Sequence, residues 1–168
     1  MADTLGCGFV YDLAVRDKST GALLSLDRRM RNRVPTEGLN DIATAYLKGG
    51  AGPGAIYVGL WSGARIPDGT ETAANLLTLV TEVTNYSQAT RLPLVLGSVS
   101  NGACSNEASL ARFDMLGATT ANGAFLSTAS AKGANTGKLL SFVRFANPRA
   151  VDETVYLEVL SGFQFISI

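Results

Sequence analysis

The residue types that carry the commonest catalytic chemistry are scarce in this sequence. None of its 168 residues is histidine, which excludes Ser-His-Asp and Cys-His catalysis, His-ligated metal sites and an imidazole pH switch. The two cysteines, Cys7 and Cys104, are too far apart in sequence to form a redox Cys-x-x-Cys pair or a zinc knuckle. No Ser-x-x-Lys motif or Asp-x-Asp-x-Asp-Gly calcium loop occurs. We therefore expect a protein without enzymatic activity, cofactor or metal, with both cysteines as free thiols in a reducing cytosol.

Glycines crowd the segment from Gly49 to Gly54, but their position argues against a phosphate-binding loop. Such a loop follows a strand and begins a helix, because the helix N-terminus supplies the anion site. Here a predicted helix comes first and a predicted strand follows. The glycines are better explained as a helix end and a flexible link.

The least ordinary local feature is a cluster of four arginines within residues 28–33. If this segment is extended, Arg29, Arg31 and Arg33 project from one face, and their planar guanidinium groups could bind carboxylates or phosphates in a bidentate manner. Nucleic acid is disfavoured because residues 22–34 contain no aromatic side chain to stack on bases, and because the formal net charge is zero.

We predict that Arg29, Arg31 and Arg33 bind an acidic protein partner. The alternative is a solvated face whose arginines pair with Asp17, Asp27 or Glu37, each pair contributing about 0–1 kcal/mol. The sequence alone leaves both open.

The elements that would position this cluster begin with an alternating strand. Phe9, Tyr11, Leu13 and Val15 recur at every second position, which predicts a half-buried strand, followed by a turn at residues 17–21 and a partner strand from residue 22. We expect residues 1–31 to form an N-terminal arm or hairpin. Because its apolar face needs a sheet to join, we predict that Phe9, Tyr11 and Leu13 contact a neighbouring subunit or another partner.

One helix is expected, over residues 36–48. Its apolar residues follow the helical period, and two glycines end it; the apolar residues are Leu39, Ile42, Ala43, Tyr46 and Leu47. The remainder predicts short strands rich in Val, Leu, Phe and Tyr, separated by Gly, Asn, Ser, Thr and Pro. These strands are expected at residues 55–61, 77–83, 92–99, 111–116, 123–127, 138–145 and 154–168, with a turn at 148–152. Residues 32–168 are therefore predicted to form an all-β domain, a β-sandwich or jelly roll with one short α-helix.

Composition favours an assembling protein. Apolar residues make up 46% of the chain and charged residues 17%, below the roughly 25% usual for charged residues in soluble proteins. We therefore expect neighbours to cover part of the surface. No apolar run approaches the roughly 18 residues that span a bilayer, and the N-terminus lacks the pattern of a secretory signal, so we expect a soluble protein made in the cytoplasm, without a membrane partner.

Several short motifs, in their order along the chain, resemble a family of small tailed-bacteriophage virion proteins. The resemblance covers roughly residues 32–146 and leaves out the N-terminal segment and the last strand. The motifs are Asn32-Arg33-Val34-Pro35-Thr36-Glu37-Gly38-Leu39-Asn40, Tyr57-Val58-Gly59-Leu60, Thr81-Glu82 with Tyr86 and Arg91, Val99-Ser100-Asn101, Gly123-Ala124-Phe125-Leu126 and Thr136-Gly137-Lys138-Leu139-Leu140.

The family includes capsid cement, or decoration, proteins, which are β-sandwich or jelly-roll modules on the outer surface of a phage head. The resemblance implies a non-enzymatic structural protein of the virion, located on the capsid surface and bound to the major capsid protein. A tail, head-tail joint or fibre component acting as a binding module is the alternative. We also expect a homo-oligomer, with a trimer favoured over a dimer because trimers suit threefold positions of a shell.

Overall fold

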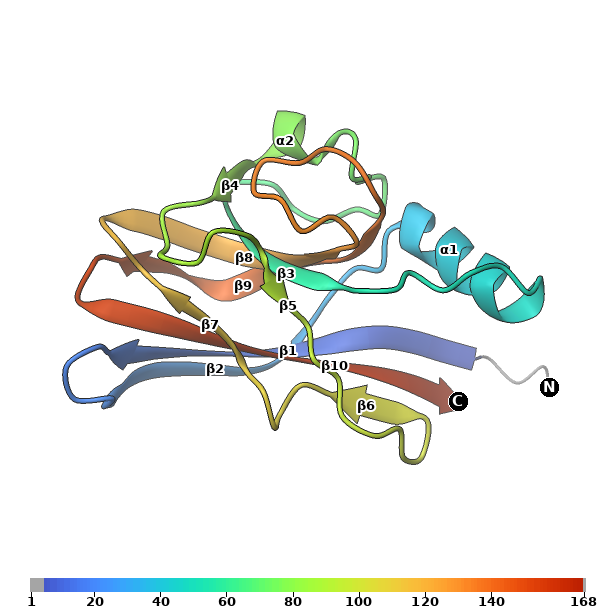
Figure 1. Ribbon diagram of the computed structural model, residues 1–168, viewed down its shortest axis with the longest axis horizontal. Helices are drawn as coiled ribbons and strands as arrows, with labels where there is room; N and C mark the ends of the chain where they lie inside the picture. The colour runs from blue at the N-terminus through green and yellow to red at the C-terminus, as the bar shows by residue number, and fades with distance from the viewer. Residues whose placement is uncertain (1–4, 168) are drawn as a thin grey trace.

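The computed structural model describes residues 5–167, and its fold is an all-β sandwich of two antiparallel sheets (Figure 1). The first sheet has the strand order β2-β1-β10-β6, and β7 also pairs with β10; the second has the order β4-β3-β8-β9, and β5 also pairs with β3. The strands of the first sheet are β1 (Leu5–Asp17), β2 (Leu23–Arg31), β6 (Ala103–Ser105), β7 (Ala111–Asp114) and β10 (Val155–Ser167). Those of the second are β3 (Tyr57–Ser62), β4 (Thr81–Val83), β5 (Leu92–Pro93), β8 (Thr119–Ser127) and β9 (Leu139–Val151).

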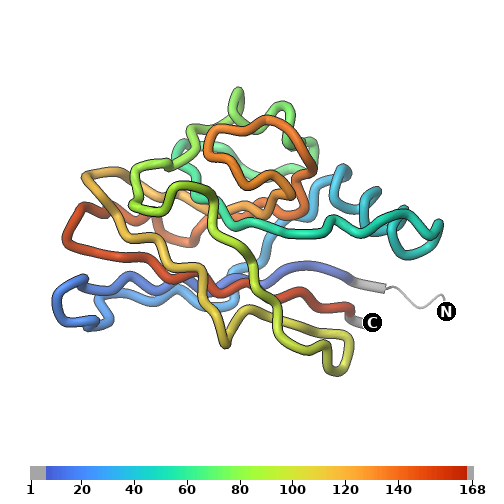
Figure 2. The backbone as a smooth tube through the Cα atoms, in the orientation of Figure 1, coloured from blue at the N-terminus to red at the C-terminus, as the bar shows by residue number. Residues whose placement is uncertain are grey.

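The first and last strands pair with each other at the centre of the first sheet. All 13 residues of β1 pair with β10, from Leu5 with Ser167 to Asp17 with Val155, and the two strands run side by side in Figure 2. Residues 5–31 form a hairpin that belongs to the same sheet as β10. Residues 1–4 and 168 lie outside the described part of the chain.

The main core lies between the two sheets. Phe9, Tyr11, Leu13 and Val15 of β1 are buried there, as the period of two requires. The Tyr11 hydroxyl crosses the sandwich and donates to Ser141 Oγ on β9 at 2.7 Å. Burial raises the pKa of Tyr11, so the phenol stays protonated and keeps this hydrogen bond at ordinary pH.

A second, smaller cluster covers the opposite face of the second sheet. Trp61 stacks on Phe142 with a centroid separation of 4.9 Å and donates its indole N–H to the Val143 carbonyl at 3.0 Å. Helix α2 (Leu76–Leu79) contributes Leu76 to this cluster. A β-carbon on Gly123 would lie 2.1 Å from the Val143 carbonyl oxygen, so only glycine permits this close packing.

Helix α1 (Thr36–Leu47) confirms the predicted helix. Its first turn is tied to its surroundings by Glu37, whose Oε2 accepts the backbone N–H groups of Ala73 and Leu139 at 2.8 and 2.7 Å. Gly38 is buried against β9, where an added β-carbon would lie 2.9 Å from the Leu140 carbonyl oxygen. These contacts fix the start of the helix on the second sheet.

Three local predictions were wrong. The expected strand at 77–83 begins as helix α2, and only residues 81–83 are strand; the expected strand at 92–99 is reduced to Leu92–Pro93. The expected turn at 148–152 lies mostly within β9, and the chain turns at residues 152–154 instead. Pro148 is tolerated there for two reasons. β9 is the last strand of its sheet, and residues 145–148 of β9 have no partner on β8, because the pairing passes from Arg144 opposite Gly123 to Arg149 opposite Ala121. The missing N–H of Pro148 therefore breaks no hydrogen bond of the sheet.

Candidate functional site

The arginine cluster begins at a β-bulge. The pairing of β1 with β2 changes from Tyr11 opposite Met30 to Leu13 opposite Asp27, which places Arg28 and Arg29 of β2 opposite the single residue Asp12 of β1. Arg29 has a φ of 54°, in the left-handed region, and its backbone N–H donates to Asp12 Oδ1 at 2.7 Å. The expectation of a regular extended segment was therefore wrong at Arg29, because the bulge interrupts the alternation.

The bulge nevertheless leaves three arginines on one surface. Arg29, Arg31 and Arg33, which we call the arginine row, are exposed and line the same open depression of ≈ 710 Å³. At Arg33 the chain crosses to the second sheet, since the backbone of Arg33 exchanges hydrogen bonds with that of Phe142 at 2.9 and 3.0 Å. This bridge fixes the backbone at one end of the row, and the bulge fixes it at the other.

The three carboxylates expected as alternative partners of this row are engaged elsewhere. Asp27 Oδ1 lies 2.7 Å from Arg149, and Glu37 holds the start of α1. Asp17 accepts the Ser19 hydroxyl at 2.6 Å and three further hydrogen bonds from Ser19 and Thr20.

These local hydrogen bonds, led by that of the Ser19 hydroxyl, lower the pKa of Asp17 from its ordinary 3.8 to about 2. Within residues 5–167, no ion pair involves any member of the arginine row.

The three apolar candidates have a different environment. Phe9, Tyr11 and Leu13 are 6%, 0% and 1% exposed, because β1 pairs with β10 and β2 of its own chain and turns this face into its own core. A partner could reach Tyr11 and Leu13 only if the sandwich opened, whereas Phe9 also lines the depression of the arginine row. The sheet that this strand was expected to find in a neighbour is the chain's own, so the structure removes the reason for assigning Tyr11 and Leu13 to a partner.

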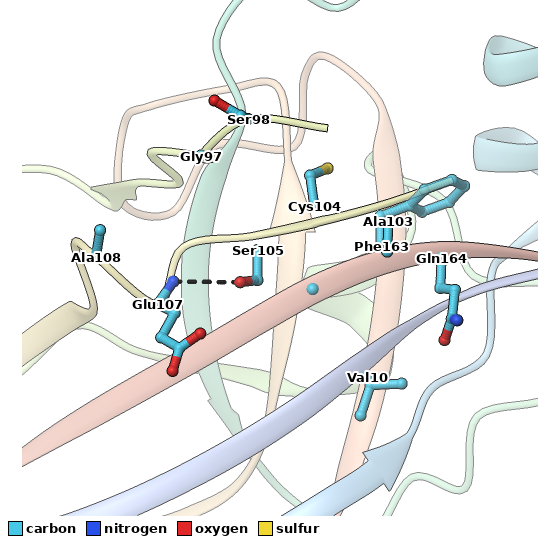
Figure 3. A pocket seen from close by; sticks show the side chains of 11 residues that line it. Val10, Gly97, Ser98, Ala103, Cys104, Ser105, Glu107, Ala108, Phe163 and Gln164 are labelled. Atoms are coloured by element: carbon cyan, nitrogen blue, oxygen red, sulfur yellow. Dashed lines mark hydrogen bonds between the residues drawn. The ribbon is translucent and has the colours of Figure 1, made fainter. Parts of the chain in front are cut away.

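A separate depression of ≈ 580 Å³ lies over β6 and the end of β10 (Figure 3). Its reactive groups are the Cys104 thiol, the hydroxyls of Ser98 and Ser105, and the Glu107 carboxylate. Ser105 accepts the backbone N–H of Glu107 at 3.4 Å, while the carboxylate of Glu107 and the sulfur of Cys104 point away from each other. Among the described residues, no hydrogen bond joins the Glu107 carboxylate to the Ser105 hydroxyl or to the Cys104 thiol.

A buried ion pair escaped the sequence analysis. Arg91 binds Glu82 in a bidentate manner, with Nε–Oε1 and Nη2–Oε2 distances of 2.9 and 2.8 Å, and both side chains are at most 3% exposed. Arg91 also donates to the carbonyls of Ala129 and Ala134, and Glu82 accepts the backbone N–H of Gly133 at 2.8 Å. The pair therefore fastens the 128–138 loop, a structural role for which the sequence offers no periodic signal.

Within residues 5–167, no group of three or more Cys, Asp or Glu residues is placed to hold a metal ion. Over the same range, no helix has the length and apolar character needed to cross a membrane. Comparisons of this chain with models of known protein families, with curated proteins and with solved structures found no match.

Proposed function

We propose that this protein is a non-enzymatic structural protein of a phage virion, a decoration or cement protein that binds the outer surface of the head and stabilises it. The observation that carries the proposal is the arginine row, three exposed guanidinium groups gathered on one depression without ion-pair partners among the described residues. Arginines arranged in this way suit an acidic protein surface, because each binds a carboxylate through two parallel hydrogen bonds. The partner proposed is the major capsid protein.

The rest of the molecule is consistent with a scaffold. The row is anchored between two sheets, at the bulge of β2 and at the bridge from Arg33 to Phe142, so its backbone is fixed before binding and little order has to be gained. Many copies on one particle would add their contacts, since subunits joined to each other and to the shell must detach together. Such a clamp would oppose the outward load of packaged DNA.

A quantitative gel of purified virions tests the location. A decoration protein is expected at a large copy number per particle, comparable with that of the capsid protein. A handful of copies would contradict the proposal and favour the tail, joint or fibre alternative.

The proposed homo-oligomer, with a trimer favoured over a dimer, now depends on surfaces other than the inner face of β1. Light scattering of the purified protein tests it. A trimer, or a dimer, supports shared contacts at a symmetry axis, whereas a monomer at high concentration contradicts the oligomer.

A further inference from the structure

A second surface feature adjoins the arginine row. Helix α1 lies beside the end of the sandwich where β1 begins and β10 ends (Figures 1 and 2). Between the helix and these strands is an apolar groove, which we call the helix groove. One part of ≈ 490 Å³ is lined by Cys7, Leu39, Tyr46, Leu47 and other apolar residues, and an adjoining part of ≈ 270 Å³ shares Ile42, Tyr46 and Phe165 with it.

The helix groove is open although its walls are apolar. Tyr46 is 86% exposed, Leu47 75%, and Leu39 and Phe165 44% each. The apolar residues whose helical spacing predicts α1 are therefore not covered by the described part of the chain. A cluster of exposed large apolar residues of this kind marks a surface that another molecule covers.

The helix groove and the arginine row are continuous. Cys7 and Leu39 line both the larger part of the groove and the depression of the arginines, and Phe9 lines both that depression and the smaller part. The one charged residue that lines the helix groove is Asp41. A ligand across both features therefore meets apolar walls and one negative charge in the groove, and three positive charges next to it.

We propose that the helix groove and the arginine row form one site for a single segment of a partner protein, in which bulky apolar side chains stand next to Asp or Glu residues. The apolar side chains enter the groove beside α1, and the carboxylates bind Arg29, Arg31 and Arg33. Asp41 repels carboxylates from the groove, which favours binding of the segment in this orientation. The inference deepens the proposed function, on which it rests for the identity of the partner, by naming the chemistry of the segment that is bound.

A second copy of this chain fits the site poorly. Six of its carboxylates are already occupied by its own arginines or by its own turns, namely those of Asp17, Asp27, Glu71, Glu82, Asp114 and Glu158. Among the described carboxylates, a self-contact has only a few such as Glu107 and Glu153 that are not already engaged, or it must break existing pairs, whereas a foreign acidic segment has neither restriction.

Photo-crosslinking in assembled virions tests the inference directly. A benzophenone amino acid in place of Leu47 is expected to crosslink to a virion protein, and peptide mapping should find a segment that contains both bulky apolar and acidic residues. The same probe in place of Ile66 is the control, because Ile66 is equally exposed, at 74%, but does not line the helix groove. Crosslinking of the Leu47 probe to another copy of this chain, to its own termini, or to a segment without acidic residues would overturn the inference.

The energetic contribution of the groove is tested by binding to particles that lack the protein. Leu47→Ser and Tyr46→Ser should each weaken attachment roughly tenfold, as expected when a large apolar contact is lost, while Ile66→Ser should leave it unchanged. Ala43→Phe, which fills the groove instead of emptying it, should weaken attachment as well. Unchanged attachment of all three groove variants, with thermal melting like that of the parent, would contradict a bound segment in the groove.

The two proposals fail in different ways. If the Leu47 probe crosslinks to an acidic and apolar segment of a tail protein, the helix groove is correct and the head location is wrong. If the protein covers the head but the probe marks no such segment, the head location stands and the groove inference is wrong.

Discussion

Two regions of this molecule treat arginine in opposite ways. At the 128–138 loop, Arg91 is 1% exposed and every polar contact it makes is internal, to Glu82, Ser127 and two backbone carbonyls. At the β2 bulge, Arg29, Arg31 and Arg33 are exposed, and their guanidinium groups form no ion pair with the described residues. The arginine that holds the fold is therefore paired within the chain, whereas the guanidinium groups of the arginine row are exposed to another molecule.

The apolar residues of the two regions repeat the contrast. Around the 128–138 loop the second sheet is covered by Trp61, Leu76 and Phe142, all at most 2% exposed. On α1, the side chains of Tyr46 and Leu47 are exposed. Substitutions in the first region should therefore lower stability, and substitutions in the second should lower binding.

The largest effect on stability is expected from Arg91→Met. The substitution leaves the carboxylate of Glu82 buried without its cation, which should lower the free energy of unfolding by about 3–5 kcal/mol. Urea denaturation measures this change. The double variant Glu82→Met with Arg91→Met should lose less, because no unpaired charge remains, and a double variant less stable than Arg91→Met would contradict the pairing argument.

An intermediate effect is expected from Gly38→Ala in α1. Alanine normally stabilises a helix relative to glycine by roughly 0.5–1 kcal/mol, but here the new β-carbon would lie 2.9 Å from the Leu140 carbonyl. Overpacking should reverse the sign and destabilise the protein by about 1–3 kcal/mol. Gly52→Ala is the matched control, since nothing lies within 4 Å of its added β-carbon. A melting temperature raised by Gly38→Ala would show that α1 does not sit tightly on β9.

The smallest effect is expected at Asp17, as a test of whether the arginine row has an internal partner. Its pKa of about 2 is caused by local hydrogen bonds, so Arg29→Ser with Arg31→Ser and Arg33→Ser should leave that pKa unchanged. An NMR titration of the carboxyl group measures it. A rise towards 3.8 in the triple variant would indicate that Asp17 interacts with the row.

The direction of the pH effect follows from the same shift. The folded-state pKa lies below the ordinary value, so the Asp17 carboxylate stabilises the hairpin above about pH 4. This contribution is lost as the pH falls towards 2.

The sequence predicted the parts of the fold that local periodicity encodes. The period of 3.6 residues placed α1, and the period of two placed the buried face of β1. The pairing of β1 with β10 was not predictable, because it joins residues about 150 positions apart and the sequence does not record which distant strand is the neighbour. For the same reason the apolar face of β1 was assigned to a partner subunit although the chain supplies its own sheet.

The candidate site was predicted only in part. The sequence identified the arginines, and the structure brings them to one depression. The bulge at Arg28 and Arg29 that places them there was not predicted by any local sequence pattern. The exposure of Tyr46 and Leu47 also escaped prediction, because an apolar helical face is normally buried. The engagement of Asp17, Asp27 and Glu37 elsewhere depends on side-chain contacts that spacing does not encode.

The central claim, that the arginine row attaches this protein to an acidic partner, is tested most directly by sedimentation with capsids that lack it. The variant Arg29→Ser/Arg31→Ser/Arg33→Ser should fold normally and bind at least about tenfold more weakly at low salt, since desolvated arginines are frequent interface hot spots. The matched control Arg28→Ser/Lys48→Ser/Lys138→Ser removes the same charge from exposed positions outside the depression and should bind nearly as well as the parent. Equal binding of both triple variants, whether unchanged or equally weakened, would contradict the account.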